Sequence, residues 1–513
     1  MGTQHVETER KYDGAALPRL DRLPGVAAVR DAAPQDLDAV YYDTADLRLL
    51  RRHITVRRRG GGEDAGWHLK LPRTGDEREE VRLPAPPGGG EVPAELVRLV
   101  AAFTRGAALV PVAHLRTHRR RVLLRDEREE VLAQVTEDRV AAQALGVDGG
   151  STTEVGGWTE FEVELDHGTP ELLDRVEAVF TDAGLARSPW PSKLARALDG
   201  TRAAGAGSAP RVAAQAPGSA GALVMDGFRA QLEALLALDA AVRLGRADSV
   251  HQMRITARRL RSLLKAHRRL FRRGSTEAPA AELRRLGRLL GRARDQEVLG
   301  ETLVDQLDAV PARLRRGALR GRLTERYAQG YRTAWRQVVA ELDGARYYAL
   351  LERLDAFAAD PPLRRRRAGR DARRYAREVL RREQRRTLKR LDRALGLEPG
   401  PRRDLALHGA RKAAKRARYT ADHAQSQVPR RSAKRAARFA GRMKDLHKVL
   451  GAHQDSVVAR QELIALEGRE AGAEQDAFAY GVLHERQRHA AEAAQRRLPE
   501  LRRRAGRRKL TRL

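Results

Sequence analysis

The sequence contains no cysteine in its 513 residues. This absence excludes disulfides, thiolate zinc sites and a cysteine nucleophile, and it fits a reducing compartment such as the cytosol. Aromatic residues make up only 4% of the chain, whereas apolar residues make up 42%. Hydrophobic cores are therefore expected, and they must be built mainly from leucine, valine and alanine.

Long apolar runs are also missing. No stretch approaches the roughly 18 consecutive apolar residues of a membrane-spanning helix. The first residues also lack the apolar segment of a secretory signal peptide. We therefore expect a cytoplasmic protein with no membrane partner.

Acidic residues balance the basic ones in only one part of the chain. Residues 1–200 contain 28 Lys and Arg against 34 Asp and Glu, a net charge of −6. Residues 201–513 contain the remaining 72 against 34, a net charge of +38. A positive field of this size attracts polyanions such as nucleic acid, an acidic membrane surface or polyphosphate.

A stretch rich in Ala, Gly, Ser and Pro, 201–221, predicts a flexible linker between two unlike parts. Before it, short β-branched or aromatic runs alternate with turn residues. This pattern predicts a mostly antiparallel sheet or barrel, interrupted by helices near 93–104 and 170–184. After it, helical periodicity broken at prolines and glycines predicts a bundle of helices. We expect domains at 1–200 and 222–505, followed by a basic tail, 506–513.

The opening stretch places Glu7, Glu9 and Lys11 on alternate residues. On a β-strand these residues share one face. Like charges this close cost stability unless a cation lies between them. Taken alone, the pattern is typical of a solvated strand face with mixed charge.

Other expected strands repeat this alternation, in Arg57 and Arg59; in Arg78, Glu80 and Arg82; in Arg119 and Arg121; and in Glu160, Glu162 and Glu164. If these faces all turn into a barrel, its lumen is lined by carboxylates and cations. A folded protein keeps such groups inside only with a bound partner. A polyanion with a divalent metal satisfies both sets, because carboxylates hold Mg²⁺ or Mn²⁺ while Lys and Arg hold phosphate oxygens.

Over about residues 5–200 the motifs resemble, in order, those of the CYTH domain, the triphosphate tunnel metalloenzymes. The matching segments are Glu7–Lys11, Tyr41–Thr44, Ile54–Arg59, His68–Lys70, Arg78–Glu80, Glu160–Glu162 and Ser192-Lys193. The resemblance implies an α+β fold around an eight-stranded antiparallel tunnel that hydrolyses triphosphates with a divalent metal. Inorganic triphosphate, thiamine triphosphate, RNA 5′-triphosphate and ATP all stay open as substrates.

The resemblance also implies roles for individual residues. Catalysis is assigned to Glu7, Glu9 and Lys11. The divalent metal, Mg²⁺ or Mn²⁺, is assigned to Glu7, Glu9, Glu160 and Glu162. Phosphate binding is assigned to Lys11, Arg57, Arg59, Lys70, Arg78, Arg119, Arg121 and Lys193. Arg58, Arg120 and Glu79 make the alternation ambiguous, because a slip of one residue turns a side chain to the other face. Glu164 can replace Glu160 as a ligand, and Asp138 is a further candidate acidic site with which Glu137 competes.

The basic part contains a duplicated pattern of a histidine followed by cations at +3, +7 and +10. Its copies are His251, Arg254, Arg258 and Arg261, and His408, Arg411, Lys415 and Arg418. These positions form one stripe on a helix. A second duplicated set is Arg284, Arg288 and Asp295, and Lys444, Lys448 and Asp455. Basic stripes are usually solvated faces, but their duplication predicts an internal repeat of two helical halves.

Over about residues 222–505 this part resembles the CHAD domain, the conserved histidine α-helical domain. The resemblance implies an all-α bundle with an internal two-fold repeat, whose basic channel binds inorganic polyphosphate. The implied contacts are His251, Arg254, Arg258, Arg261, Arg284, Arg288, His408, Arg411, Lys415, Arg418, Lys444 and Lys448. Asp295 and Asp455 are expected to orient cations.

The combined expectation is a metal-dependent triphosphatase whose helical domain binds polyphosphate, with association to polyphosphate granules as a further expectation. The alternative is a non-catalytic polyphosphate-binding scaffold. Specific binding of nucleic acid is less expected, because aromatic residues that stack on bases are sparse on the stripes. No helix-turn-helix or zinc signature is present either.

Overall fold

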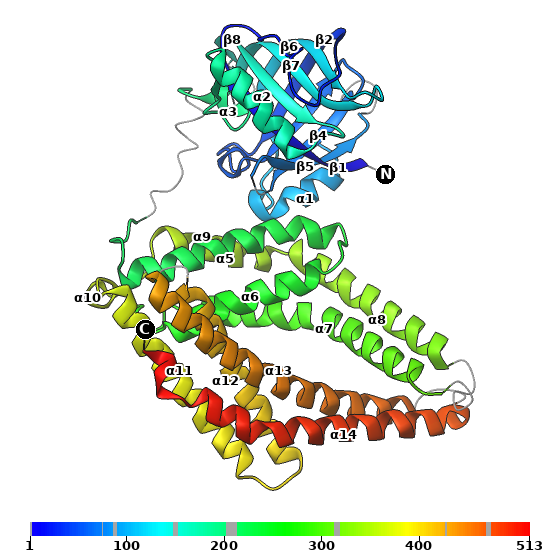
Figure 1. Cartoon of the computed structure of the whole chain (residues 1–513), viewed down its shortest axis with the longest axis vertical. Helices are drawn as coiled ribbons and strands as arrows, with labels where there is room; N and C mark the ends of the chain where they lie inside the picture. Colours follow the sequence, from blue (N-terminus) through cyan, green and yellow to red (C-terminus); the bar gives the residue numbers. More distant parts are fainter. Residues whose placement is uncertain are drawn as a thin grey trace. The chain divides into compact units, whose positions relative to one another are not determined.

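The computed structural model describes residues 3–73, 75–85, 90–146, 152–201, 213–311, 319–425, 428–467 and 473–512. The chain divides into two compact units, residues 1–210 and 211–513 (Figure 1). The expected linker, 201–221, spans this boundary. Residues 202–212 of it lie outside the described residues, and helix α5 begins inside it, at Ala220.

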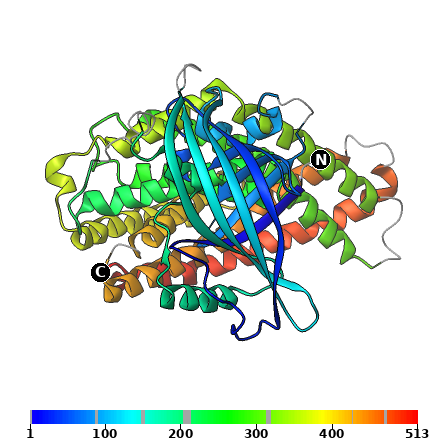
Figure 2. The same cartoon turned by 90° about the horizontal axis from the view of Figure 1, so that it is seen from above.

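The first unit is built around a closed ring of eight antiparallel strands (Figures 1 and 2). Neighbouring strands follow the order β5-β4-β3-β2-β6-β7-β8-β1, and pairing of β1 with β5 closes the ring. A two-residue strand, β9 (Ala186–Arg187), pairs with β1. The ring strands are β1 (Thr3–Asp13), β2 (Ala28–Asp43), β3 (Thr55–Gly60), β4 (Gly66–Pro72), β5 (Glu77–Leu83), β6 (Val110–Arg125), β7 (Val131–Leu145) and β8 (Thr152–Leu165). The predicted eight-stranded tunnel is confirmed.

Helices and apolar side chains complete this unit. Helix α2 (Pro170–Asp182) packs on the outside of the ring, against the buried side chains of Phe161 and Val163. Helix α3 (Lys193–Leu198) packs instead against Leu115 and Val140, which point inward because they alternate with lumen residues. Helix α1 (Ala94–Thr104) and a 3-10 turn (Leu50–Arg52) lie between strands in the chain. Apolar packing thus closes part of the lumen and leaves the rest to charged side chains.

The second unit is all-helical, as expected. Its helices are α5 (Ala220–Arg243), α6 (Ser249–Ala266), α7 (Glu277–Asp308), α8 (Leu319–Leu342), α9 (Ala345–Ala359), α10 (Arg365–Ala368), α11 (Ala372–Leu395), α12 (Pro401–Gln425), α13 (Arg430–Glu467) and α14 (Ala473–Ala505). Helices α5 to α8 and α11 to α14 form two similar sets, with α5 packed on α11 and α6 on α12 (Figure 1). The two sets also meet at the ends of α7, α8, α13 and α14, in a buried cluster that includes Leu307, Leu323, Leu463 and Leu483. The predicted internal repeat is confirmed.

The last residues pack against the helical unit. Residues Arg508–Thr511 form a 3-10 turn, and Thr511 is buried. The side-chain amide of Gln384 donates to the carbonyl of Ala505 at 2.8 Å, and Arg435 donates to the carbonyl of Arg512. The segment expected as a basic tail, 506–513, is therefore folded over much of its length, because its backbone carbonyls accept hydrogen bonds from α11 and α13.

Candidate functional site

The charged residues of the ring line a cavity of about 600 Å³ in the lumen. Strand pairing explains why, because it places Lys11 opposite Glu162 and Glu9 opposite Glu164 between β1 and β8. Ten residues implicated by the sequence line this cavity: Glu7, Glu9, Lys11, Arg57, Arg59, Lys70, Arg78, Arg119, Arg121 and Lys193. Glu162 and Glu164 line it as well, whereas Glu160 lies buried beside it.

Three carboxylates from β7 and β8 converge on one point. Asp138, Glu160 and Glu162 can each offer one oxygen, and the three oxygens lie within 4.8 Å of one another. The ammonium of Lys193 lies 2.9, 2.7 and 2.8 Å from them, respectively. Hard oxygen ligands at this spacing suit Mg²⁺ or Mn²⁺, and a cation already occupies their centre. Binding of a metal here would therefore require Lys193 to move away.

Local structure holds Lys193 in that position. Ser192 caps α3, and its hydroxyl accepts a hydrogen bond from the backbone N–H of Ala195 at 3.1 Å. Leu194 and Leu198 anchor the helix in the apolar part of the lumen. Burial alone would lower the pKa of Lys193, but the neighbouring carboxylates outweigh it and raise that pKa well above its usual value. The structure pairs Lys193 with three carboxylates, and its expected contact with phosphate stays a prediction.

A second group of possible metal ligands forms between β1 and β5. His5, Glu7 and Glu80 can offer one ligand atom each, within 4.8 Å of one another. Glu7 and Glu80 are almost fully buried, and cations already contact both: Lys70 and Arg82 pair with Glu7, and Arg82 also pairs with Glu80. Sequence reasoning assigned no role to His5 or Glu80, although Glu80 belongs to the alternating pattern of β5.

Glu9 lies in neither group of ligands. Its carboxylate pairs with Arg78 at 2.9 Å, Lys11 at 3.4 Å and Lys70 at 3.7 Å. Burial raises the pKa of Glu9, but these cations outweigh it and lower the pKa to about 2. The four expected metal ligands are therefore not all together. Glu7 belongs to the group between β1 and β5, and Glu160 and Glu162 belong to the group on β7 and β8. Glu9 is surrounded by cations.

Glu164 behaves differently from the other lumen carboxylates. Burial, together with the charges of Glu7, Glu9 and Glu162, outweighs the attraction of Lys70 and raises the pKa of Glu164 to about 7. Within the described residues no ion pair of Glu164 is found. A lumen carboxyl that exchanges its proton near neutral pH is suited to accept a proton from water.

Arginine side chains lie among these carboxylates in the lumen. Arg119 binds both oxygens of Asp138, at 2.7 and 2.6 Å, and also contacts Glu162. Arg57 donates to the hydroxyl of Tyr41. Arg59 pairs with Asp64, and Arg121 pairs with the exposed Glu63 at 3.1 Å. Several of these guanidiniums therefore have few carboxylate partners and are available to an anion.

The register decides between two residues that the sequence left open. Asp138 pairs with Arg119 across β6 and β7 and is fully buried in the lumen. Glu137 points outward, where its carboxylate lies 3.1 Å from the guanidinium of Arg139. Arg120 also points outward and pairs with Asp31 at 3.0 Å. Asp138 is therefore the lumen acid of β7.

The duplicated stripes of the helical unit lie on α6 and α12, which pack against each other. Arg254 pairs with Asp295 at 3.0 Å, and Arg411 lies 3.9 Å from Asp455, so both aspartates contact the cations they were expected to orient. A ring nitrogen, Nδ1, of each stripe histidine, His251 and His408, is buried without a hydrogen-bond partner. The repeat is therefore visible in individual contacts.

Cations from both halves meet at the centre of the stripes. Burial first, and then Arg258, Arg411, Arg254 and Arg418, lower the pKa of Lys415 to about 6. His447 of α13 lies in the same group, since burial and Lys415 are the leading causes that lower its pKa to about 3. The cations of the second duplicated set have exposed side chains: Arg284, Arg288, Lys444 and Lys448. Sequence reasoning missed His447, because the first half carries Gly287 at the matching position and the duplication gave no signal.

Comparison with known families identifies both units. Residues 5–198 match the CYTH domain, and residues 226–464 match the CHAD domain. The chain is a CYTH–CHAD protein. The curated relatives include the Uncharacterized protein MT2285 of Mycobacterium tuberculosis (strain CDC 1551 / Oshkosh). It is 37% identical over 509 residues, 96% of this chain and 95% of the relative.

Several solved structures are similar to part of this chain. The CHAD domain of the plant Ricinus communis is 25% identical, with a TM-score of 0.43, over 60% of this chain and 98% of that one. The putative adenylyl cyclase HpAC1 from Hippeastrum, described as having a dominant triphosphatase activity, is 15% identical, with a TM-score of 0.22, over 39% of this chain and 97% of that one. PptA from Streptomyces chartreusis is 21% identical, with a TM-score of 0.45, over 55% of this chain and 99% of that one.

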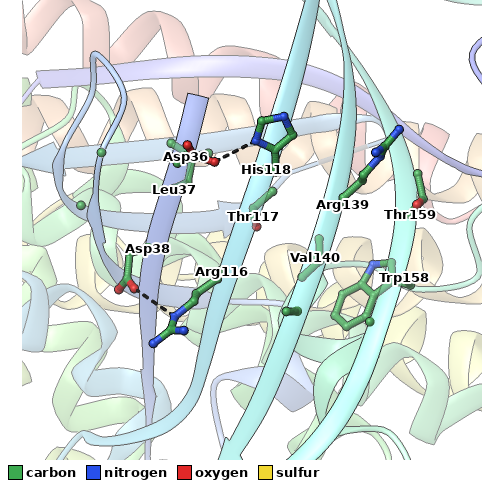
Figure 3. Close-up of a pocket in the computed structure, with 14 residues that line it drawn as sticks. Asp36, Leu37, Asp38, Arg116, Thr117, His118, Arg139, Val140, Trp158 and Thr159 are labelled. Atoms are coloured by element: carbon green, nitrogen blue, oxygen red, sulfur yellow. Dashed lines mark hydrogen bonds and ion pairs between the residues drawn. The ribbon is translucent and has the colours of Figure 1, made fainter. Parts of the chain in front are cut away.

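The CYTH unit has a second, shallower hollow of about 820 Å³ on its outer face (Figure 3). Cross-strand pairs border it, with His118 2.8 Å from Asp36 and Arg116 3.8 Å from Asp38. Asp36 and Arg116 are largely exposed, so these pairs contribute little to stability. The buried carboxylates and the convergent cations lie in the lumen, which is the better candidate for chemistry.

Among the described residues, no helix combines the length and apolar character needed to cross a bilayer.

Proposed function

We propose that the CYTH unit hydrolyses inorganic triphosphate, or a related triphosphate, with a divalent metal. One observation carries this proposal: a cavity of about 600 Å³ whose lining combines guanidinium and ammonium groups with groups of buried carboxylates. The cations match a chain of phosphates and the carboxylates match Mg²⁺ or Mn²⁺. A phosphoanhydride hydrolase needs this charge arrangement and no protein nucleophile.

In the proposed reaction, different residues bind the phosphates, hold the metal and accept the proton. Arg57, Arg119 and Arg121 bind and orient the phosphate oxygens, while Asp138, Glu160 and Glu162 would hold the metal. A bound Mg²⁺ or Mn²⁺ would neutralise charge on the phosphoryl oxygens. The ammonium of Lys193, displaced from the three carboxylates, becomes free to contact phosphate. Glu164 accepts a proton from the attacking water, for which a pKa of about 7 suits it.

The test is phosphate release by the purified full chain from inorganic triphosphate, with Mg²⁺, with Mn²⁺ and with a chelator. We expect release only with metal. Release should be at least about 100-fold less in Asp138→Asn, which loses a proposed metal ligand, and in Glu7→Gln/Glu9→Gln, which loses the carboxylates that hold Lys70 and Arg78 in the lumen. Glu137→Gln is the matched control, since Glu137 is the neighbour of Asp138 on the outer face.

Two results would count against this proposal. Release that persists in both lumen variants would place the site elsewhere. No release from any triphosphate in the wild type would leave the non-catalytic scaffold as the better interpretation.

For the CHAD unit, we propose that it binds inorganic polyphosphate along the stripes of α6 and α12. Supporting this, guanidinium and ammonium groups from both halves lie close enough at Lys415 to lower its pKa. Repulsion of this kind costs folding free energy, and a bound polyanion would relieve it. Polyphosphate suits the site better than nucleic acid, because Tyr419 already has Arg259 and Arg418 over its ring.

The test is competition between polyphosphate and duplex DNA at equal phosphate concentration and near-physiological salt. We expect polyphosphate to remain bound. Displacement by DNA would favour a nucleic-acid binder instead, because the net positive charge alone recruits any polyanion at low salt.

A further inference from the structure

A cavity of about 420 Å³ lies among α5, α6 and α12 of the CHAD unit. None of the stripe residues implicated in polyphosphate binding lines it. Its mouth is at the exposed Asp226 and Ala230, and its floor is at the buried His267, Tyr419 and Thr420. The volume lies within the range of small-molecule sites.

The internal repeat shows what is unusual about this cavity. Helices α5 and α11 correspond, since each has 24 residues and each N-cap side chain, Ser219 or Asp371, accepts from the backbone N–H three residues later. Gln231 and Glu383 are both the twelfth residue after these caps. Arg259 and Arg416 are likewise both the eighth residue after their stripe histidines.

In the second half of the repeat, an ion pair joins the two corresponding positions. The guanidinium of Arg416 lies 2.6 Å from the carboxylate of Glu383, which is 2% exposed. In the first half, Gln231 replaces the acid, and its side-chain oxygen is buried without a partner. In the part of the chain that the structure describes, no ion pair of Arg259 is found, and its guanidinium lies over the ring of Tyr419 at 5.6 Å. The first half thus keeps the cation but lacks a carboxylate in direct contact with it, although the charge of Arg259 acts on the nearby Asp422.

Small residues in α5 leave the space open. Gly227 and Ala230 stand where α11 has Val379 and Arg382. A Cβ on Gly227 would lie 1.7 Å from the imidazole of His423, so glycine is what lets this ring form one wall of the cavity. The cavity therefore arises from specific residues of the first half.

His267 adds a buried donor to the cavity floor. It is 2% exposed, and its Nε2 has no hydrogen-bond partner. Its Nδ1 lies 3.0 Å from the hydroxyl of the buried Tyr375. A buried phenol that stays protonated must donate its hydrogen, so Nδ1 accepts and Nε2 carries the N–H. An unpaired buried N–H costs free energy that a ligand oxygen would recover.

We propose that this cavity binds a small organic anion, a carboxylate or a phosphate ester, whose oxygens accept hydrogen bonds from Arg259 and His267. The apolar body of the ligand would contact Leu263 and Ala230. Two carboxylates line the cavity, and each has a cation beside it: Asp226 lies 3.5 Å from Arg229, and Asp422 lies 3.4 Å from Arg418. Burial outweighs the charges of Arg418 and Arg259 and raises the pKa of Asp422, which weakens its repulsion of an anion.

The test measures binding of benzoate and of phenyl phosphate to the full chain by calorimetry, in near-physiological sodium chloride, which screens the exposed cations. The two probes distinguish the carboxylate from the phosphate ester. We expect saturable binding of at least one probe in the wild type. We also expect at least about tenfold weaker binding in Arg259→Ala, and in Gln231→Glu, which supplies Arg259 with the carboxylate that Glu383 gives Arg416. Arg366→Ala, an exposed loss of one positive charge, is the matched control.

Circular dichroism would establish that the variants are folded. The proposal is overturned if neither probe saturates by about 10 mM, the weak limit of useful affinity. It is also overturned if Arg259→Ala and Gln231→Glu bind like the wild type. Because Gln231 lies off the stripes, polyphosphate binding by Gln231→Glu should be unchanged, so a failure here leaves the proposed function untouched.

Discussion

The ammonium of Lys193 lies 2.7 Å from the buried carboxylate of Glu160, where α3 enters the lumen. Asp138 and Glu162 share the same ammonium. Lys193 therefore holds together carboxylates that would otherwise repel one another. The position suits either this ammonium or a divalent metal, and the competition between the two can be measured.

Lys193→Met should destabilise the CYTH unit and make its stability depend on metal. Removing one partner from a buried ionic group costs about 3–5 kcal/mol, because uncompensated charges remain. A divalent metal that binds the three freed carboxylates should restore stability by mass action. Thermal unfolding followed by tryptophan fluorescence would detect this, since Trp67, Trp158 and Trp190 lie in this unit and Trp335 lies in the other.

Mn²⁺ should therefore raise the unfolding temperature of Lys193→Met more than that of the wild type. Arg139→Met, which changes a cation on the outer face, is the control and should shift stability by no more than about 0.5 kcal/mol. An equal effect of Mn²⁺ on the wild type and on Lys193→Met would show that the three carboxylates do not hold the metal.

Glu164→Gln should raise stability at alkaline pH. The pKa of Glu164 rises from 4.5 to about 7 on folding, so the folded protein binds this proton more tightly than the unfolded chain. The stability that this proton contributes is fully present below about pH 4.5 and is lost as pH rises to about 7. Above that pH the wild type bears a cost of about 3 kcal/mol that glutamine avoids.

Denaturant unfolding at several pH values would check this prediction. The variant and the wild type should differ little near pH 4.5 and most above pH 7. Glu137→Gln should show no such divergence. A pH-independent difference between Glu164→Gln and the wild type would mean that Glu164 titrates normally.

The sequence predicted the lumen well where alternation of charge was strong. Glu7, Glu9 and Lys11 share a face simply because a strand has a period of two, and the structure places all three in the cavity. It could not choose between Glu137 and Asp138, because that choice depends on the register with β6, and a slip of one residue reverses it. Nor could it foresee that Lys193 would bind carboxylates, since the position of its ammonium depends on how α3 packs inside the ring.

In the CHAD unit the sequence predictions depended on the internal repeat, so they reached only residues that both halves share. Residues present in both halves, such as Arg254 and Arg411, could be recognised from their duplication. His447 and the cavity at Gln231 could not, because each exists in one half only. Differences between the halves become visible only when the structure shows which positions correspond and what each one contacts.

Polyphosphate binding should be accompanied by proton uptake at Lys415. Burial first, and then the surrounding arginines, lower the pKa of this lysine to about 6, so it is mostly neutral at pH 7.5. A bound polyanion would raise that pKa and draw in a proton. Calorimetry in buffers of different ionisation enthalpy would measure the uptake.

We expect an uptake approaching one proton per site at pH 7.5 and much less at pH 5, where Lys415 is already charged. Lys415→Arg should remove this uptake while retaining affinity, because arginine keeps its proton. Equal uptake in Lys415→Arg and the wild type would place the titrating group elsewhere.

The two halves of the repeat should contribute similarly to binding of long polyphosphate. Arg254 and Arg411 occupy equivalent positions, each near an aspartate of the following helix. Each should release about one counterion on binding, so Arg254→Ala and Arg411→Ala should each reduce the slope of log affinity against log salt by about 0.7–0.9. Fluorescence anisotropy with labelled polyphosphate would give these slopes. Arg366→Ala should leave the slope unchanged, and a loss confined to one half would show that the anion lies on only one of the two stripes.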